Sequence, residues 1–223
     1  MSKEAVKSSS SSFIMLRAMV GIGILCGFLI VVAYEGTLPR VQRLKAEALQ
    51  AAIFKVIPGI TQTETFMWDG ESFTPAEESA NTLVYAGYND AGALIGVAIA
   101  ASGQGYADII SILYGYDPEN QQVIGFYVLE SKETPGLGDK IEKDENFLDN
   151  FTAMDVSLTA SGDQLVNSIV PVKSGTKKDA WEVDGITGAT ISSRAIGNIL
   201  DESTSIWVPR IYNHVSAFTL KNQ

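Results

Sequence analysis

The 223-residue sequence predicts an α+β protein that has a single N-terminal transmembrane helix and then one domain, with a mostly antiparallel sheet and flanking helices. Three observations support this prediction. An apolar run of membrane-spanning length lies near the N-terminus. Four strand-like segments are joined by short turns. A helical repeat follows a turn of small residues at 184–190. The hydrophobic content of 46% is enough for the core of one domain.

Residues 13–34 form the apolar run, and Arg17 is the only charge within it. Arg17 lies near one end, where its side chain can reach the membrane interface. A buried helix of a soluble protein would show a polar face, and this segment has none. A cleaved signal peptide is the competing interpretation, because positive charges precede the apolar core. We favour an uncleaved anchor, because no good small-x-small cleavage site follows Tyr34.

The segments on either side of this anchor differ in character. Residues 1–12 are polar and rich in serine, so we expect a disordered leader. Residues 35–58 show helical spacing of apolar side chains and end at Pro58-Gly59, which predicts an amphipathic stalk helix. The stalk either packs on its own domain or contacts partner membrane subunits. Basic residues flank the anchor equally on both sides, so charge does not decide its orientation.

Residues 59–223 are predicted to form the domain. Its first part, 60–80, reads as a loop or short strands. Four apolar segments follow, separated by turn residues such as Asn89-Asp90 and Asp117-Pro118, and hairpin connections imply antiparallel pairing. The predicted strands are Thr82–Tyr88, Leu94–Ala101, Ala107–Tyr116 and Val123–Glu130.

The later part of the chain mixes short helices and strands. Phe147, Leu148 and Phe151 suggest the buried face of a short helix. Trp181 and Val183 suggest a short strand. Residues 206–223 have apolar side chains at roughly helical spacing, which fits either a last packed helix or a surface element at the membrane.

Composition excludes several classes of function. The net charge of −10 argues against nucleic-acid binding, which needs a basic surface. Cys26 and His214 are the only cysteine and the only histidine, so we predict no disulfide, no metal site and no iron–sulfur centre. We also find no convincing acid–base pair and predict no catalytic residue. The Gly103-Gln104-Gly105 turn is no dinucleotide fingerprint, because a strand follows it. Any redox chemistry must come from an organic cofactor.

The turn Asp184-Gly185-Ile186-Thr187-Gly188-Ala189-Thr190 opens a helix. Its glycines allow unusual backbone angles and close approach of a ligand. Thr190, Ser192 or Ser193 is expected to be the N-cap of this helix. The helix face itself is marked by four apolar residues: Ala195, Ile196, Ile199 and Leu200.

A helix start has unpaired N–H groups and the positive end of the helix dipole, so it suits a phosphate. A hydroxyl group at this position has two uses. It can cap the helix, or it can itself be esterified to a phosphate.

The pattern Asp-x-x-Thr-Gly-Ala-Thr resembles the flavinylation motif of the FMN-binding domain family, in which the last Ser or Thr carries FMN through a phosphoester bond. The resemblance makes Thr190 the attachment residue, and Asp184, Thr187, Gly188 and Ala189 fit the other positions.

A second segment, Glu133-Thr134-Pro135-Gly136-Leu137-Gly138, resembles a loop of the same family, particularly of Rnf-type members. Two motifs in the right order argue against a chance match. The resemblance implies that Thr134, Leu137 and Gly138 contact the flavin. Tyr106 is a further candidate for lining the flavin pocket, with a structural role equally open. Glu133 is expected to pair with Lys140 or to meet the cofactor.

The resemblance implies a function. The chain would carry covalent FMN as an electron-transfer subunit of an Rnf-type, redox-driven ion-translocating complex and would turn over no substrate alone. Its partners would be other membrane and redox subunits, together with a flavin transferase that uses FAD and magnesium and recognises Asp184. The helix would cross a bacterial or archaeal cytoplasmic membrane once, with the leader inside and the domain on the outer face.

Other functions remain open. The first is the C subunit of the sodium-pumping NADH:quinone reductase, which shares both motifs. The second is a structural or assembly subunit, in which the Thr-Gly-Ala-Thr turn only caps a helix. The third is a standalone flavoprotein reductase, which ranks last for lack of an acid–base pair.

Overall fold

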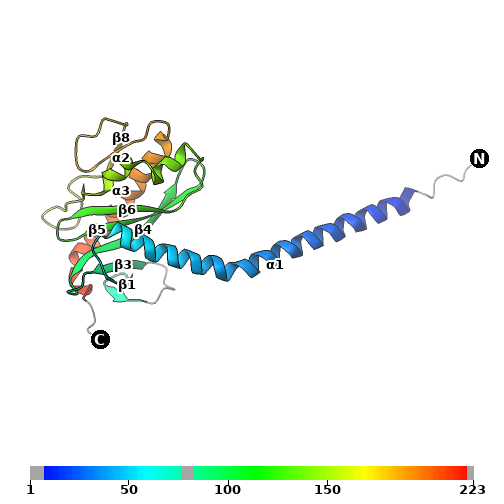
Figure 1. Ribbon diagram of the computed structural model, residues 1–223, viewed down its shortest axis with the longest axis horizontal. Helices are drawn as coiled ribbons and strands as arrows, with labels where there is room; N and C mark the ends of the chain where they lie inside the picture. Colours follow the sequence, from blue (N-terminus) through cyan, green and yellow to red (C-terminus); the bar gives the residue numbers. More distant parts are fainter. Residues whose placement is uncertain (1–7, 77–82, 220–223) are drawn as a thin grey trace, which may run out of the picture. The chain divides into compact units, whose positions relative to one another are not determined.

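The structure is a computed structural model that describes residues 8–76 and 83–219 (Figure 1). The chain divides into two compact units, Met1–Glu47 and Ala48–Gln223. Helix α1 (Ser8–Val56) runs through the first unit and ends in the second.

Helix α1 contains a stretch long and apolar enough to cross a membrane, and no side chain in that stretch is buried. The predicted limit between anchor and stalk at residue 34 shows no break, since the helix continues past Pro39 to Val56. The hydroxyl of Thr37 donates to the backbone carbonyl of Ala33 at 2.8 Å, within the same helix. Of the predicted disordered leader, residues 8–12 are helical and 1–7 lie outside the described residues. The anchor and stalk boundaries stay predictions.

The second unit is built on a seven-stranded sheet in which every neighbouring pair is antiparallel. The fold class predicted from the sequence is confirmed. The strand order is β2-β1-β3-β4-β5-β6-β7. The strands are β1 (Gln62–Trp68), β2 (Phe73–Pro75), β3 (Leu83–Tyr88), β4 (Leu94–Gln104), β5 (Ile109–Asp117), β6 (Gln122–Glu130) and β7 (Met154–Asp155).

The four predicted strands correspond to β3, β4, β5 and β6. Thr82, the predicted start of the first of them, lies outside the described residues. Strands β1 and β2 arise within 60–80, where the sequence predicted only a loop or short strands. A separate parallel pair, β8 (Val170–Val172) and β9 (Glu182–Asp184), contains the predicted short strand near Val183.

The helices of this unit follow β6 and β9. Short turns η1 (Gly138–Glu142), α2 (Glu145–Leu148) and η2 (Asp149–Phe151) come first, and the ring of Phe126 on β6 stacks on Phe151 at 4.3 Å. Helix α3 (Thr190–Asn213) continues through Pro209, and η3 (Val215–Ala217) follows. The predicted C-terminal helix therefore corresponds to residues 206–213 of α3 together with η3, and 220–223 lie outside the described residues.

Helix α3 covers one face of the sheet. The four apolar residues that predicted its inner face, from Ala195 to Leu200, are all buried. Successive side chains of strand β5 point to opposite faces of the sheet. Ile112 and Tyr114 belong to the same core cluster as α3, while Leu113 between them belongs to the cluster on the other face. The buried hydroxyl of Tyr114 bonds to Ser203 Oγ at 2.9 Å. This face therefore joins helix and sheet by apolar packing and one buried polar contact.

The last turns of α1 pack on the opposite face. Ile53, Val56 and Ile57 form a second buried cluster with Ala98 of β4 and Leu113 of β5. The sheet makes room for them with a row of four glycines on four neighbouring strands, which we call the glycine row: Gly87, Gly96, Gly115 and Gly125. A Cβ on Gly115 would lie 2.0 Å from the carbonyl oxygen of Val56. Only glycine allows the helix end to approach the sheet so closely.

Substitution in the glycine row is expected to destabilise the domain. In Gly125→Ala, the added Cβ would lie 2.4 Å from the Val56 carbonyl oxygen, which is backbone and cannot rotate away. We expect a loss of about 1–3 kcal/mol in the free energy of unfolding, the usual range for an overpacked site. Urea unfolding of the full chain in detergent measures it. Gly36→Ala is the control, because nothing lies within 4 Å of its Cβ position. An unchanged midpoint for Gly125→Ala would contradict this packing.

Candidate functional site

A pocket of about 350 Å³ lies where three segments meet. They are the turn between β4 and β5, the loop after β6, and the start of α3. Seven of the nine site residues predicted from the sequence line this pocket, all except Asp184 and Thr187. The lining residues are Tyr106, Thr134, Leu137, Gly138, Gly188, Ala189, Thr190, Ile191 and Ser192.

Three apolar side chains of the pocket lining are largely exposed. Tyr106 is 64% exposed, Ile191 is 55% exposed and Leu137 is 52% exposed. Each belongs to a different one of the three segments. Apolar walls with a few placed polar groups are typical of small-molecule sites. This lining suits a flat, largely apolar ligand.

The start of α3 supplies the polar end of the pocket. Ala189 occupies the N-cap position and no side chain caps the helix, so the prediction that Thr190, Ser192 or Ser193 is the N-cap was wrong. Ser192 Oγ donates instead to the buried carboxylate of Glu133, and Ser193 Oγ accepts the N–H of Ile186 at 3.2 Å. Tertiary contacts have taken these hydroxyls, which leaves the first N–H groups of α3 available to an anion.

Thr190 is the first residue of α3 and lies exposed in the pocket lining. Within the part of the chain that the structure describes, its hydroxyl forms no hydrogen bond. The preceding Gly188 has φ of +86°, which turns the chain into the helix. An accessible hydroxyl beside unpaired N–H groups is the arrangement that a phosphoester at this residue requires.

Asp184 and Thr187 line a second, smaller and more polar pocket of about 190 Å³. The Asp184 carboxylate accepts the backbone N–H of Gly175 at 2.9 Å and that of Thr176 at 3.3 Å. Asp184 therefore holds the preceding loop, while Thr187 is exposed. The structure therefore places these two motif residues in the lining of the smaller pocket and not in the lining of the 350 Å³ pocket.

Asn150 is a structural partner of the motif that the sequence did not reveal. Its side chain is buried, with Oδ1 accepting the N–H of Asp184 at 3.0 Å and Nδ2 donating to the Asp184 carbonyl at 3.2 Å. Lys177 Nζ also donates to Asn150 Oδ1, at 3.0 Å. Burial lowers the pKa of Lys177, and the charges of Asp184 and Glu182 oppose that shift. Asn150 stands in a segment without any motif, so only the fold could identify it.

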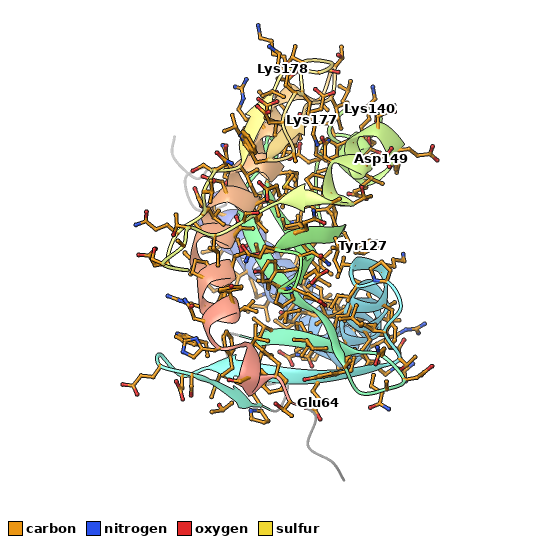
Figure 2. All side chains as sticks on the ribbon, turned by 90° about the vertical axis from the view of Figure 1, so that its left-hand side faces the viewer. Glu64, Tyr127, Lys140, Asp149, Lys177 and Lys178 are labelled. Carbon is orange, nitrogen blue, oxygen red and sulfur yellow. The ribbon has the colours of Figure 1, made fainter. Side chains whose placement is uncertain are left out.

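Basic residues gather near these loops. Figure 2 shows Lys140, Lys177 and Lys178 at one end of the domain, while Glu64 lies at the other end. Lys140 lines the smaller pocket with Asp184. Glu133 does not pair with Lys140, one of its two predicted roles. The Glu133 carboxylate accepts the N–H groups of Tyr106 and Ala107 instead, beside its bond to Ser192.

Comparison with known families decides what kind of site this is. Residues 105–204 match the model of the FMN-binding domain. The matched range begins at the turn that carries Tyr106 and ends within α3, so it contains all three segments of the pocket. Residues 105–204 belong to the FMN-binding domain family. The family predicted from the two motifs is thereby confirmed.

Two relatives from other organisms match this chain over different lengths. The chain is 28% identical over 187 residues to the G subunit of the ion-translocating oxidoreductase complex of Methanosarcina acetivorans, covering 82% of this chain and 87% of that protein. It is 37% identical over 114 residues to the protein of the same name from Photorhabdus laumondii, covering 51% of this chain and 49% of that protein. The chain thus spans about half the length of the second relative.

Two solved structures share the fold. The crystal structure of Shewanella oneidensis NqrC superposes with a TM-score of 0.56 at 18% identity, covering 79% of this chain and 96% of that one. The C subunit of the Na⁺-translocating NADH-quinone reductase from Parabacteroides distasonis gives a TM-score of 0.57 at 20% identity, covering 82% and 98%. At these identities the likeness establishes the fold alone.

The pocket of the FMN-binding domain fits its cofactor. The volume of about 350 Å³ is within the range of small-molecule sites. The exposed apolar residues Tyr106, Leu137 and Ile191 offer surface to the isoalloxazine ring. The uncapped start of α3 suits the phosphate. The lining therefore offers apolar surface suited to the ring and a helix start suited to the phosphate.

Removal of the Asn150 amide is expected to loosen the motif. In Asn150→Ala, the N–H and the carbonyl of Asp184 both lose their partner, and an unsatisfied buried polar group costs about 1–3 kcal/mol. Urea unfolding measures the loss. Asn120→Ala, which removes an exposed amide bonded to Asp117, is the matched control and should change the free energy of unfolding by less than about 0.5 kcal/mol. Equal effects of both variants would contradict the role of Asn150.

Proposed function

We propose that this chain is a membrane-anchored electron-transfer subunit that carries FMN covalently on Thr190, within a redox-driven ion-translocating complex. One observation carries the proposal. The hydroxyl of Thr190 is exposed at the uncapped start of α3 and lines the pocket of an FMN-binding domain. When bound, FMN supplies reversible electron transfer, and the protein contributes its position and its environment.

The residues of the pocket divide the work of holding the cofactor. Thr190 forms the phosphoester, and the first N–H groups of α3 neutralise the phosphate. Tyr106, Leu137 and Ile191 exclude water from the ring. Thr134 and Gly138 offer backbone groups of a rigid turn, in which the N–H of Leu137 already bonds to the carbonyl of Thr134 at 3.1 Å.

Attachment requires a second protein, a flavin transferase that uses FAD and magnesium. The oxygen of Thr190 forms a bond to the FMN phosphorus of FAD, the bond between the two phosphates breaks, and AMP leaves with the proton. The chain gains the mass of FMN less one water. Asp184, whose carboxylate holds the loop of Gly175 and Thr176, would help the transferase recognise the motif.

The membrane and the complex are proposed from the anchor and the relatives. The apolar stretch of α1 and the relatives named as the G subunit of an ion-translocating oxidoreductase complex support a membrane-anchored member of such a complex. A covalent link suits a domain on the outer face, where a lost flavin is not easily replaced. The C subunit of a sodium-translocating NADH:quinone reductase is the second candidate, favoured by the fold of the solved structures. Other membrane and redox subunits would be the electron donors and acceptors.

Thr190→Ala is expected to abolish covalent flavin. The protein is co-expressed with a flavin transferase, separated under denaturing conditions, and examined by in-gel flavin fluorescence and intact mass. Wild type should fluoresce and carry the added mass, and Thr190→Ala should show neither. Ser205→Ala is the control, because it removes an exposed hydroxyl of α3 that lies outside both the motif and the pocket lining. Label retained in Thr190→Ala would end the assignment. A dark wild type, under conditions that label a known acceptor, would favour a structural subunit.

Asp184→Asn is expected to lower flavin loading while the fold is kept. The amide oxygen can still accept the N–H of Gly175, the shorter of the two bonds, while the exposed N–H of Thr176 loses its acceptor and the charge of the motif is removed. The fraction of labelled protein after a fixed time with transferase measures the effect, and the unfolding midpoint tests the fold. We expect at least a tenfold lower rate of labelling at an unchanged midpoint. Wild-type labelling would remove Asp184 from the recognition proposal.

A further inference from the structure

The carboxylate of Glu133 lies at the centre of the three segments that form the pocket. It is 5% exposed, and it is the only acidic side chain among the buried residues of the described chain. Oε1 accepts the backbone N–H of Tyr106 at 2.8 Å and that of Ala107 at 3.0 Å. Oε2 accepts the hydroxyl of Ser192 at 2.5 Å. One side chain therefore ties the β4–β5 turn and the start of α3 to the loop after β6.

The surrounding backbone is shaped to admit this carboxylate. A Cβ on Gly105 would lie 2.5 Å from Oε1, and a Cβ on Gly138 would lie 2.5 Å from Oε2. Both glycines have ordinary backbone angles, since neither is among the residues with positive φ. A Cβ on Gly105 would also lie 2.6 Å from Cδ1 of Ile110. Space for the neighbouring side chains, Glu133 at both positions and Ile110 at Gly105, and not turn geometry, therefore explains why both positions are glycine.

The hydrogen bonds match an ionised side chain. A carboxylate accepts hydrogen bonds and donates none. Two of the groups bonded to Glu133 are backbone N–H groups, which can only donate, and the Ser192 hydroxyl donates to it as well. The positive end of the α3 dipole adds to their effect, because Ser192 lies in the first turn of that helix. Within the described residues no Lys, Arg or His forms an ion pair with Glu133. Its charge is stabilised by dipoles and not cancelled by a cation.

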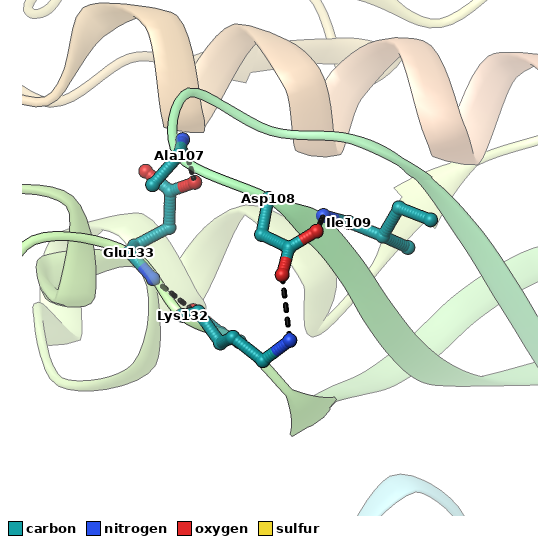
Figure 3. A network of polar contacts seen from close by, with 6 residues as sticks. Ala107, Asp108, Ile109, Lys132 and Glu133 are labelled. Carbon is teal, nitrogen blue, oxygen red and sulfur yellow. Dashed lines mark hydrogen bonds and ion pairs between the residues drawn. The ribbon is translucent and has the colours of Figure 1, made fainter. Parts of the chain in front are cut away.

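The nearest acidic neighbour differs in all these respects. Asp108, in the same β4–β5 turn, pairs with Lys132 at 2.6 Å and lies at the surface, as Figure 3 shows beside Glu133. Its other oxygen accepts the N–H of Ile109 at 2.8 Å. Both carboxylates therefore bond to the β4–β5 turn. The charge of Asp108 is exposed and paired with Lys132, whereas the charge of Glu133 is buried and has no cation partner within the described residues.

We propose that Glu133 is a positioning residue that holds the pocket walls together and places one uncompensated negative charge behind the bound flavin, which lowers its reduction potential. Three of its contacts, Tyr106, Gly138 and Ser192, line the pocket directly. Flavin that takes up two electrons and one proton gains one negative charge. A nearby buried carboxylate repels that charge, and the low dielectric around it keeps the repulsion strong.

The proposal rests on the function proposed above, and Glu133→Gln tests it. The amide has the shape of the carboxylate, its Oε1 still accepts from the turn, and its NH₂ donates to Ser192 Oγ. The charge alone is lost. Flavin loading is first measured by fluorescence and mass, and the midpoint potential of the loaded full chain is then measured by spectral titration with dithionite. We expect at least a tenfold shift toward the reduced form, an increase of about 30 mV for a two-electron couple.

Asp108→Asn is the matched control, the same change of carboxylate to amide on the same turn. Asp108 is exposed and paired with Lys132. We therefore expect the ratio of reduced to oxidised flavin in Asp108→Asn to stay within twofold of wild type under the same conditions. Repeating both measurements at about 1 M salt distinguishes the two variants further, because salt screens exposed charges strongly and buried charges weakly. Only the Glu133→Gln shift should survive it. An unshifted, fully loaded Glu133→Gln would overturn the proposal and leave the flavin assignment standing.

If the Glu133 variant takes up no flavin, its potential is not measurable, and a second measurement tests the proposal. Amide hydrogen exchange of the flavin-free full chain in detergent follows the N–H groups of Tyr106 and Ala107 in Glu133→Ala. We expect at least tenfold faster exchange at these two amides and unchanged exchange in the centre of β5. Unchanged protection at 106 and 107 would overturn the proposal. A wild type that never binds FMN would instead refute the proposed function.

Discussion

The packing of α3 against the sheet is the contact on which the rest of the site depends. Ile196, Ile199 and Leu200 bury the helix in the core, and Gly103 on β4 lets Ile199 approach, since a Cβ there would lie 2.6 Å from its side chain. The contact fixes where the helix begins. With that start in place, Thr190 and the free N–H groups of the first turn meet the loops that carry Tyr106 and Leu137.

Both faces of the sheet are occupied, each in a different way. Helix α3 packs on the sheet through apolar side chains. At the end of α1, the backbone of Val56 itself packs against the glycine row. Close packing of a carbonyl group on glycines leaves little freedom for sliding or rotation. The end of α1 is therefore held firmly on the sheet, whose other face carries α3.

Polar groups that the core cannot leave unpaired shape the site itself. Glu133 and Asn150 are both buried, and each satisfies backbone groups of a loop that lines or supports the pocket. Most buried polar side chains in proteins are hydrogen-bonded, because an unpaired one costs free energy. Such residues specify one loop conformation. The hydroxyls expected to cap α3 bond to other groups instead. Ser192 Oγ donates to the Glu133 carboxylate, and Ser193 Oγ accepts the N–H of Ile186.

The amino-acid sequence by itself determined the class of fold, the four central strands, the buried face of α3 and the two motifs, because period, turn residues and local spacing are properties of neighbouring residues. Only the tertiary structure decided that Asp184 and Thr187 stand beside the main pocket and that α1 and α3 run unbroken through Pro39 and Pro209. It decided between the loop and the short strands that the sequence had left open for 60–80, in favour of β1 and β2. It alone revealed the glycine row and the contacts of Glu133 and Asn150. Each of these depends on partners distant in the chain, and pairing across such distances leaves no pattern along the sequence.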